Sequence, residues 1–322
     1  MKKLILLLSI VFISGSAMAQ QEIQYTNFMF SQLNFNPGYT GMGDGICAQG
    51  LMRQQWMGYK GTDDEGGAPN TAYFSIHSPI KYLFGGLGLA VSNDKIGFET
   101  NTSVRLSYSY HLNIGQGVLG LGLQAGFINK QIDFDKFRPV DPSDPLLQSK
   151  AVESAMNMDL AFGAYYKTEN YYAGFSATQM QGLWGTKAEF SNKIAAPEYA
   201  GHYFLTGGYY WQMPMAPAFT INPNVLIKTD FASAQYDINV LAWYNNQMYA
   251  GVTYRATDAV SVLAGYRVES GFLDGLSGGI SYDITTSAMS AGTAGSFEIY
   301  IKYCFKIVVE PKPQKHGTVL YL

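Results

Sequence analysis

Hydrophobic and polar residues alternate along most of this chain, and the alternation is most regular near its end. In the stretch 296–305, SFEIYIKYCF, phenylalanine, isoleucine and tyrosine side chains share one face, whereas Glu298 and Lys302 share the other. A period of two residues is typical of β-strands, because successive side chains point to opposite faces. The pattern therefore predicts a strand with one apolar and one polar face.

The same pattern recurs from about residue 46 onward and predicts fourteen strands. Their approximate ranges are 46–56, 70–78, 84–92, 102–112, 117–128, 156–166, 171–179, 202–212, 218–228, 235–245, 247–255, 259–267, 275–284 and 296–305. No layer of helices accompanies them, so lipid is the expected cover for the apolar faces. A sheet in hydrocarbon cannot leave an edge unpaired, because its amides would have no hydrogen-bond partners. We therefore predict an all-β fold, a single transmembrane antiparallel β-barrel of about fourteen strands.

Loop lengths and strand faces make this barrel prediction more specific. An even number of strands puts both chain ends on the periplasmic side, so alternate connections face outward. The expected outer loops include 57–69, 93–101, 129–155, 180–201 and 285–295. The expected lipid-facing side chains include Leu119, Leu121, Ile299 and Ile301. Pro223 lies inside a predicted strand and indicates a bulge there.

The first nineteen residues are typical of a secretory signal peptide. Lys2 and Lys3 precede the apolar stretch 4–13, and the small-residue sequence AMA ends at Ala19. A membrane-spanning helix needs about 20 apolar residues, so this stretch is too short to be one. We predict that residues 1–19 are cleaved off after Ala19 and that the mature chain reaches the outer membrane.

Three further regions follow the predicted signal peptide. Residues 20–45 are rich in Asn, Gly and aromatic residues and precede the long alternation, which predicts an irregular, plug-like segment in or under the barrel. Residues 46–305 would form the barrel itself. Residues 306–322 contain Pro311 and Pro313, which break strands, and several lysines that favour water over lipid. We expect them to form a short periplasmic C-terminal tail.

Composition agrees with an outer-membrane barrel of one domain. Only 14% of the 322 residues are charged and 15% are aromatic, with 35 glycines and 24 tyrosines. Mean hydropathy is nevertheless close to zero, at −0.03, because polar lumen positions offset lipid-facing ones. The formal net charge of −3 gives no reason to expect a nucleic-acid partner.

The sequence indicates no catalytic, cofactor or metal site. The four histidines lack ligand spacing, and the acidic groups at 63–65 and 133–144 lack the glycine and bidentate glutamate of a calcium loop. The glycine-rich stretches at 85–88 and 120–122 lie inside predicted strands, without the strand-to-helix unit of a nucleotide site. No nucleophile, base and orienting acid can be assembled, so we do not expect an enzyme.

A set of short motifs in a fixed order resembles a known family, the PorP/SprF outer-membrane proteins of the type IX secretion system. The motifs span nearly the whole mature chain: FMFSQLNFNPGYTG (28–41), RQQW (53–56), HSP (77–79), GLGL (86–89), NDKIG (93–97), FRPVDP (137–142), YYAGFS (171–176), PNVLIK (223–228), YAGVTYRATDAV (249–260), SYDIT (281–285) and GSFEIYIKY (295–303). Their order and spacing, more than any single motif, carry the resemblance.

The resemblance implies a partner protein of an export machine and not a catalyst. Family members help large surface proteins, often adhesins of gliding motility with a C-terminal sorting domain, to be secreted or anchored at the cell surface. The implied partners are such a surface protein, other secretion-system components and the outer-membrane bilayer. Two alternatives stay open: a barrel of the fatty-acid-transporter type that passes small apolar molecules, and a passive pore.

Eight residues are candidates for partner contact by their positions. Phe137, Arg138, Asp141 and Trp184 lie in predicted outer loops, and Arg53, Arg105, Arg255 and Lys302 lie on predicted lumen faces. For each there is a simpler interpretation, because barrel lumens need charged residues for hydration and bracing.

The two cysteines fall on the strands that must pair when the barrel closes. Cys47 lies near the start of the first predicted strand and Cys304 near the end of the last, both on the lumen face. An oxidising periplasm permits a disulfide bond there. The alternative is two free thiols, because barrel shear could place the Cα atoms more than about 7 Å apart.

Overall fold

The computed structural model describes most of the chain. The described residues are 22–43, 45–59, 67–137, 152–180 and 200–306. The predicted signal peptide, 1–19, and the predicted tail beyond residue 306 lie outside these ranges.

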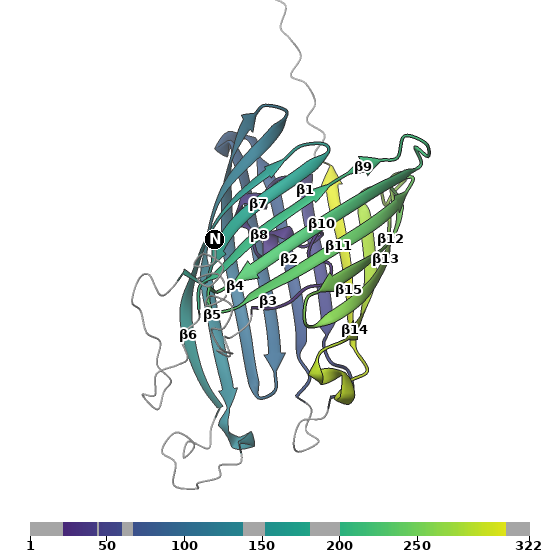
Figure 1. Ribbon diagram of the computed structural model, residues 1–322. Helices are drawn as coiled ribbons and strands as arrows, with labels where there is room; N and C mark the ends of the chain where they lie inside the picture. Colours follow the sequence, from purple (N-terminus) through teal and green to yellow (C-terminus); the bar gives the residue numbers. More distant parts are fainter. Residues whose placement is uncertain (1–21, 44, 60–66, 138–151, 181–199, 307–322) are drawn as a thin grey trace, which may run out of the picture.

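The chain forms a closed antiparallel β-barrel (Figure 1). Its strands are β1 (Gly45–Gln54), β2 (Asn70–Ile80), β3 (Gly85–Ile96), β4 (Glu99–Ile114), β5 (Gly117–Asp133), β6 (Val152–Lys167), β7 (Tyr171–Thr178), β8 (His202–Tyr209), β9 (Trp211–Gln212), β10 (Phe219–Thr229), β11 (Ala234–Tyr244), β12 (Met248–Arg255), β13 (Ala259–Arg267), β14 (Leu276–Thr285) and β15 (Ser296–Lys306). Each strand of the ring pairs with its neighbour, and β15 pairs with β1 to close it. The ring contains fourteen strands, as predicted, and β9 is a two-residue strand outside it.

The outer face of the wall is apolar and the inner face is polar. Among the predicted lipid-facing residues, Leu121, Ile299 and Ile301 are exposed, and Leu119 occupies the same face of β5 as Leu121. The opposite positions of these strands, such as Glu298, are buried in the lumen. The prediction of alternating lipid and lumen faces is therefore confirmed.

Strands β4, β5 and β6 are longer than the sequence indicated, with 16, 17 and 16 residues. Parts of the predicted outer loops 93–101 and 129–155 continue the strands, so these two loop predictions were wrong in extent. A transmembrane strand needs only about 9–11 residues. The extra length projects beyond the hydrocarbon, where no apolar face is required and the alternation weakens.

The bulge predicted at Pro223 does not form. Strand β10 pairs with β11 in one continuous register across Pro223, and with β8 and β9 in one shared register. Proline has no backbone N–H to donate. The pairing of β10 on the side away from β11 is therefore interrupted between the end of β8 and the start of β9. Asn222 replaces part of it by donating from Nδ2 to the Tyr209 carbonyl at 2.9 Å. The proline thus causes a gap in the pairing without adding a residue.

Connection lengths orient the barrel in the membrane. At one end the turns are short, as at 115–116, 168–170 and 245–247, whereas the other end carries the connections 134–151 and 179–201. Bacterial barrels have short periplasmic turns and long extracellular loops. We call these ends the inner and the outer end, and β1 begins at the inner end.

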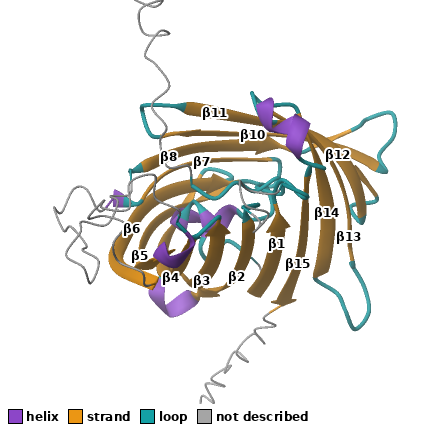
Figure 2. Cartoon of the chain, turned by 90° about the horizontal axis from the view of Figure 1, so that it is seen from below, coloured by secondary structure: helices purple, strands orange, loops and turns teal. Residues whose placement is uncertain are grey.

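Residues 22–43 lie inside the barrel, and we call them the lumen segment. It contains two 3-10 turns, η1 (Gln32–Asn34) and η2 (Pro37–Tyr39). Figure 2, seen along the barrel, shows short helical turns and loops within the ring of strands. Hydrophobic clusters form between segment and wall, such as Phe28 and Phe35 with Phe204. Among the described residues, no helix is both long and apolar enough to cross a membrane.

Candidate functional site

We divide the lumen segment into an outer half, residues 22–32, and an inner half, residues 33–43. The inner half is fixed by close contact between backbones. A Cβ atom added to Gly122 would overlap the backbone of Pro37 and Gly38, and one added to Gly86 would overlap Thr40 and Gly41. Glycine permits this approach because it has no side chain beyond hydrogen. These glycines in β3 and β5 therefore allow η2 and the two residues after it to lie directly against the wall.

Neutral hydrogen bonds complete the attachment of the inner half. Asn36 Nδ2 donates to the carbonyl oxygens of Ala164 (3.1 Å) and Phe175 (3.3 Å), and Asn36 Oδ1 accepts from the Gly38 amide at 2.8 Å. Ser176 Oγ donates to the Phe35 carbonyl at 2.6 Å. Asn36 thus caps η2 and joins it to both β6 and β7.

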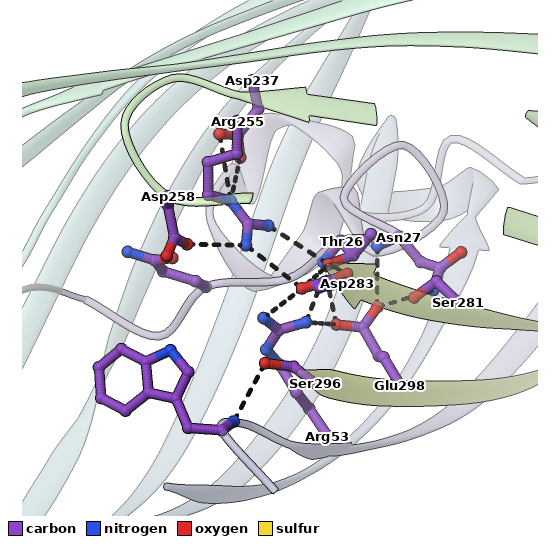
Figure 3. A network of polar contacts seen from close by, with 12 residues as sticks. Thr26, Asn27, Arg53, Asp237, Arg255, Asp258, Ser281, Asp283, Ser296 and Glu298 are labelled. Atoms are coloured by element: carbon purple, nitrogen blue, oxygen red, sulfur yellow. Dashed lines mark hydrogen bonds and ion pairs between the residues drawn. The ribbon is translucent and has the colours of Figure 1, made fainter. Parts of the chain in front are cut away.

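The outer half of the lumen segment is held mainly by charged side chains (Figure 3). Glu298 of β15 accepts hydrogen bonds from the backbone amides of Thr26 (2.9 Å) and Asn27 (2.8 Å). Thr26 Oγ1 donates to Asp283 of β14 at 2.8 Å, and Asn27 Nδ2 donates to Ser281 Oγ at 3.1 Å. The segment therefore meets two carboxylates, which need positive partners to be stable in a buried site.

Arg53 supplies one of these positive partners. Its guanidinium lies 2.7 Å from Asp283 and 3.2 Å from Glu298, and Nη1 donates to Thr26 Oγ1 at 2.8 Å. The side chain is only 2% exposed. Removing one partner of a buried ion pair typically costs about 3–5 kcal/mol, because an uncompensated charge stays behind. Arg53 therefore braces β1, β14 and β15 against the lumen segment.

Arg255 supplies the second positive partner. It lies 3.3 Å from both Asp237 and Asp258 and 3.5 Å from Asp283, and its side chain is fully buried. Its Nη2 also donates to Thr26 Oγ1 at 3.3 Å. Thr26 is thus shared between the two arginines, and Asp283 joins them into one network (Figure 3).

Arg105 holds the outermost described residue of the segment. Its Nε lies 2.9 Å from Asp159 of β6, and its Nη2 lies 3.9 Å from Glu22. Glu22 also accepts a hydrogen bond from Thr178 Oγ1 at 3.1 Å. The segment therefore begins, in the described part of the chain, near the outer end of β7.

Lys302 lies at the inner end of the lumen, against an aromatic side chain. Its Nζ donates to Tyr39 Oη at 3.3 Å and lies 5.6 Å from the centre of that ring. Phe30 stacks on Tyr300 with ring centres 4.9 Å apart, and Tyr249 donates to Tyr300 Oη at 3.0 Å. Aromatic packing thus joins the segment to β12 and β15.

The structure brings four of the predicted site residues to one feature. Arg53, Arg105 and Arg255 contact the outer half of the segment, and Lys302 contacts the inner half. Their contacts are those of bracing residues inside the barrel. Asp283 and Glu298, the partners of these arginines, were not predicted as site residues. The signal that could have found them is that each lies on the polar face of a strand with alternating residues.

Of the four predicted outer-loop residues, the structure describes Phe137, which lies away from this feature. Phe137 is 40% exposed and packs its ring against Phe98 and Phe134 beyond the end of β5. Arg138, Asp141 and Trp184 lie outside the described residues. Partner contact by these four residues stays a prediction.

Cys47 and Cys304 face each other across the seam between β1 and β15. They are direct register partners, with Cα atoms 4.0 Å apart and with the two sulfur atoms facing each other. Cys47 is buried on the lumen side, next to Gly43 of the lumen segment. The register of this seam places the two residues directly opposite each other, which is the arrangement that the disulfide prediction requires.

A cavity of about 580 Å³ lies at the outer end of the lumen, and we call it the outer vestibule. It is lined by Glu22, Ile23, Gln24, Gln55, Trp56, Pro69, Thr71, Asp94, Ile96, His202, Lys228, Thr229, Asp230, Ser233, Ala234, Gln235, Ala256, Thr257 and Asp258. A second cavity of about 210 Å³ adjoins it and shares Glu22 and Asp94. In the part of the chain that the structure describes, no cluster of three or more His, Cys, Asp or Glu is arranged to hold a metal ion.

Comparison with known proteins identifies the family to which the chain belongs. The family model of the type IX secretion system membrane protein PorP/SprF matches residues 17–303. No curated protein matches the chain.

Similar solved structures are barrels with little sequence identity. The toluene transporter TodX of P. putida is 9% identical at a TM-score of 0.47, covering 85% of this chain and 93% of that one. A Pseudomonas aeruginosa FadL homologue is 14% identical at 0.42, covering 84% and 93%. Acinetobacter baumannii Omp33 is 9% identical at 0.42, covering 81% and 98%. The family match spans nearly the whole barrel, so this outer-membrane protein belongs to the PorP/SprF family of type IX secretion system membrane proteins.

Proposed function

We propose that this barrel supports the secretion or the surface anchoring of a large adhesin-like protein with a C-terminal sorting domain. It would do so by binding protein and not by catalysis. Membership of the PorP/SprF family supports a role in type IX secretion. The observation that carries the proposal further is the lumen segment, which lies inside the barrel and is attached to several sides of its wall.

The attachments of the segment favour a binding role over a passive pore. Asn36 joins the segment to β6 and β7, whereas Thr26 and Asn27 join it to β14 and β15. Buried charge pairs and backbone contacts of this kind resist displacement. The barrel, with the segment attached inside it, would therefore present a fixed outer surface to an exported protein.

The lining of the outer vestibule favours a polar partner over small apolar molecules. Asp94, Asp230, Asp258 and Lys228 all line it, together with several amide and hydroxyl side chains. Pockets for small molecules are lined predominantly by hydrophobic and aromatic side chains, with only a few polar groups. A peptide segment of an exported protein suits this lining better than a fatty acid does.

Other secretion-system components would meet the barrel at its inner end. The predicted tail, 306–322, begins at the last residue of β15, and β15 ends at the inner end of the barrel. A chain that stops after residue 306 tests this contact. We expect the shortened barrel to assemble but to display less of the surface protein on cells, and unchanged display would rule out the contact.

Deletion of the gene, with complementation, tests the proposed function. Surface protein would be measured by protease accessibility and by antibody labelling of intact cells. We expect the deletion to abolish display and the wild-type gene to restore it, with the surface protein co-purifying with the barrel. Normal display in the deletion strain would refute the proposal. Ion conductance of the purified barrel in planar bilayers would favour a passive pore. Bound lipid in its lumen would favour a barrel of the fatty-acid-transporter type.

A further inference from the structure

The outer end of the lumen carries an excess of negative charge. The charged residues that line the two outer cavities, together with the whole ion-pair network that is connected to them, include nine carboxylates and five basic groups among the described residues. The carboxylates are Glu22, Asp94, Glu99, Asp159, Asp230, Asp237, Asp258, Asp283 and Glu298, and the basic groups are Arg53, Arg105, Lys130, Lys228 and Arg255. The excess is four negative charges with the histidine neutral. Low-dielectric walls focus such a field into the cavity.

Glu22 points to a ligand that donates hydrogen bonds. It lines both cavities and is 8% exposed, and its Oε1 accepts no hydrogen bond from any described residue. The nearest cation, Arg105, is 3.9 Å from this oxygen and is closer to Asp159, at 2.9 Å. A buried carboxylate oxygen without a donor is costly. An ammonium or guanidinium group in the vestibule would satisfy it.

Two further carboxylates of the vestibule have no ion-pair partner among the described residues. Within the described part of the chain, Asp94, which is 5% exposed, accepts a hydrogen bond from Thr71 Oγ1 alone, at 2.6 Å. Asp230 lies in the outer turn after β10. Partial burial acts to raise the pKa of Asp230, but hydrogen bonds from Ser233 and Ala232 outweigh it and lower that pKa. Asp230 is therefore ionised at neutral pH.

Lys228 is the one basic residue among the described side chains that line the vestibule, and it reduces the excess without reversing it. It is 8% exposed and interacts electrostatically with Asp237, Glu22 and Asp258. Its position among carboxylates makes it a counter-charge for the wall. An anionic ligand would have to approach Lys228 past these carboxylates, against the field of the cavity.

We propose that the outer vestibule binds a basic, lysine- or arginine-containing extended segment of the exported protein. This inference rests on the proposed function and names the chemistry of the partner. The cavity volume of about 580 Å³ lies within the ~300–1,000 Å³ range of ligand pockets. Glu22, Asp94 and Asp230 would accept hydrogen bonds from the cationic groups, and the excess of negative charge would draw the segment in.

Peptide binding to the purified full-length barrel in detergent tests this proposal. The probes are two fluorescent peptides of equal length, one alternating lysine with glycine and serine, the other alternating glutamate with them. We expect the basic peptide to bind at least about tenfold more tightly, and its affinity to fall with rising salt as exposed charges are screened. The double variant Asp94→Asn, Asp230→Asn should weaken this binding about tenfold, or about 1.4 kcal/mol, because it removes two negative charges from the lining of the vestibule.

The chain provides a control that is matched in charge. Glu169→Gln with Glu269→Gln removes two carboxylates from inner turns, far from the vestibule, and should leave peptide binding unchanged. In the vestibule variant, asparagine keeps an oxygen that can accept from Thr71 and from the Ala232 and Ser233 amides. The variant should therefore fold, which gel mobility before and after heating can verify.

Three results would overturn the proposal. Equal affinity for both peptides would show that the vestibule does not select ligands by charge. Tighter binding of the acidic peptide would show that it binds an anion, at Lys228. Binding of calcium alone, lost in the vestibule variant while neither peptide binds, would make the cavity a metal site. If the wild-type barrel supports surface display in cells, each of these results refutes only the basic segment. Failure of the proposed function would appear instead as normal display in the deletion strain.

Discussion

The two halves of the lumen segment are bound to the same barrel by different physical means. In the inner half, η2 lies against glycines of β3 and β5, and its hydrogen bonds come from neutral groups such as Asn36. In the outer half, Thr26 and Asn27 contact the carboxylates and arginines of a buried ionic network. One continuous segment therefore has a sterically fixed end and an electrostatically fixed end.

This difference indicates that the two halves of the segment have separate roles. Close backbone packing is short in range and insensitive to salt, so it fixes where the segment lies. A buried charge network adds little net stability but is specific, because losing any member leaves another charge uncompensated. The outer half also determines the electrostatic field of the vestibule. Substitutions that act on one half and spare the other can test these roles.

The largest expected effect comes from the outer network. Arg53→Met should lower the free energy of unfolding by about 3–5 kcal/mol, because Asp283 and Glu298 would stay buried without their shared cation. Urea unfolding of the barrel in lipid vesicles measures this change. Lys81→Met, in the exposed inner turn η3 (Lys81–Leu83), is the control and should have no measurable effect. Equal stability of the two variants would contradict the bracing role of Arg53.

The second effect concerns the seam beside the inner half. We predict a disulfide bond between Cys47 and Cys304, whose replacement by alanine in both strands should cost about 2–4 kcal/mol. Mass spectrometry of the unreduced protein should find one linked peptide pair. Two thiols that are freely alkylated in the native protein would rule out the bond.

The third effect tests the steric end of the segment. Gly122→Ala should destabilise the barrel by about 1–3 kcal/mol, because its Cβ would overlap the backbone of Pro37 and Gly38. Limited proteolysis should then cut within residues 22–43. Gly50→Ala is the matched control, since the nearest atom to its Cβ would be Ile301 Cγ2 at 3.8 Å. A resistant Gly122→Ala segment would show that the inner half is not held by packing.

The smallest effect separates charge from packing within the inner half. Lys302→Met should change stability by less than about 1 kcal/mol, because Lys302 is half-buried and keeps its apolar contact with Tyr39 as methionine. The same urea titration as for Arg53→Met measures it. A loss as large as that of Arg53→Met would mean that charge governs both halves.

The sequence predicted the wall far better than the contents of the lumen. Alternation of apolar and polar residues determines strand faces, and closure of the ring places Cys47 opposite Cys304. Residues 22–43 have no periodic pattern, so their path and their contacts with Glu298 could not be derived. Leu51 and Leu241 point into the lumen, where polar residues were expected, because the segment supplies an apolar cover there. Strand ends beyond the membrane were missed because the alternation has no lipid to enforce it.

Disulfide cross-linking in intact cells tests most directly whether the segment lies inside the barrel. Asn27 and Ser281 lie in contact, with Nδ2 and Oγ 3.1 Å apart, although 254 positions separate them in the chain. Because both positions are buried and in contact, the variant Asn27→Cys, Ser281→Cys should form a disulfide bond under oxidising conditions and give a looped chain of altered gel mobility before reduction. Either single variant alone should give none. Full labelling of both new cysteines without a cross-link would contradict a barrel plugged by its own N-terminal segment.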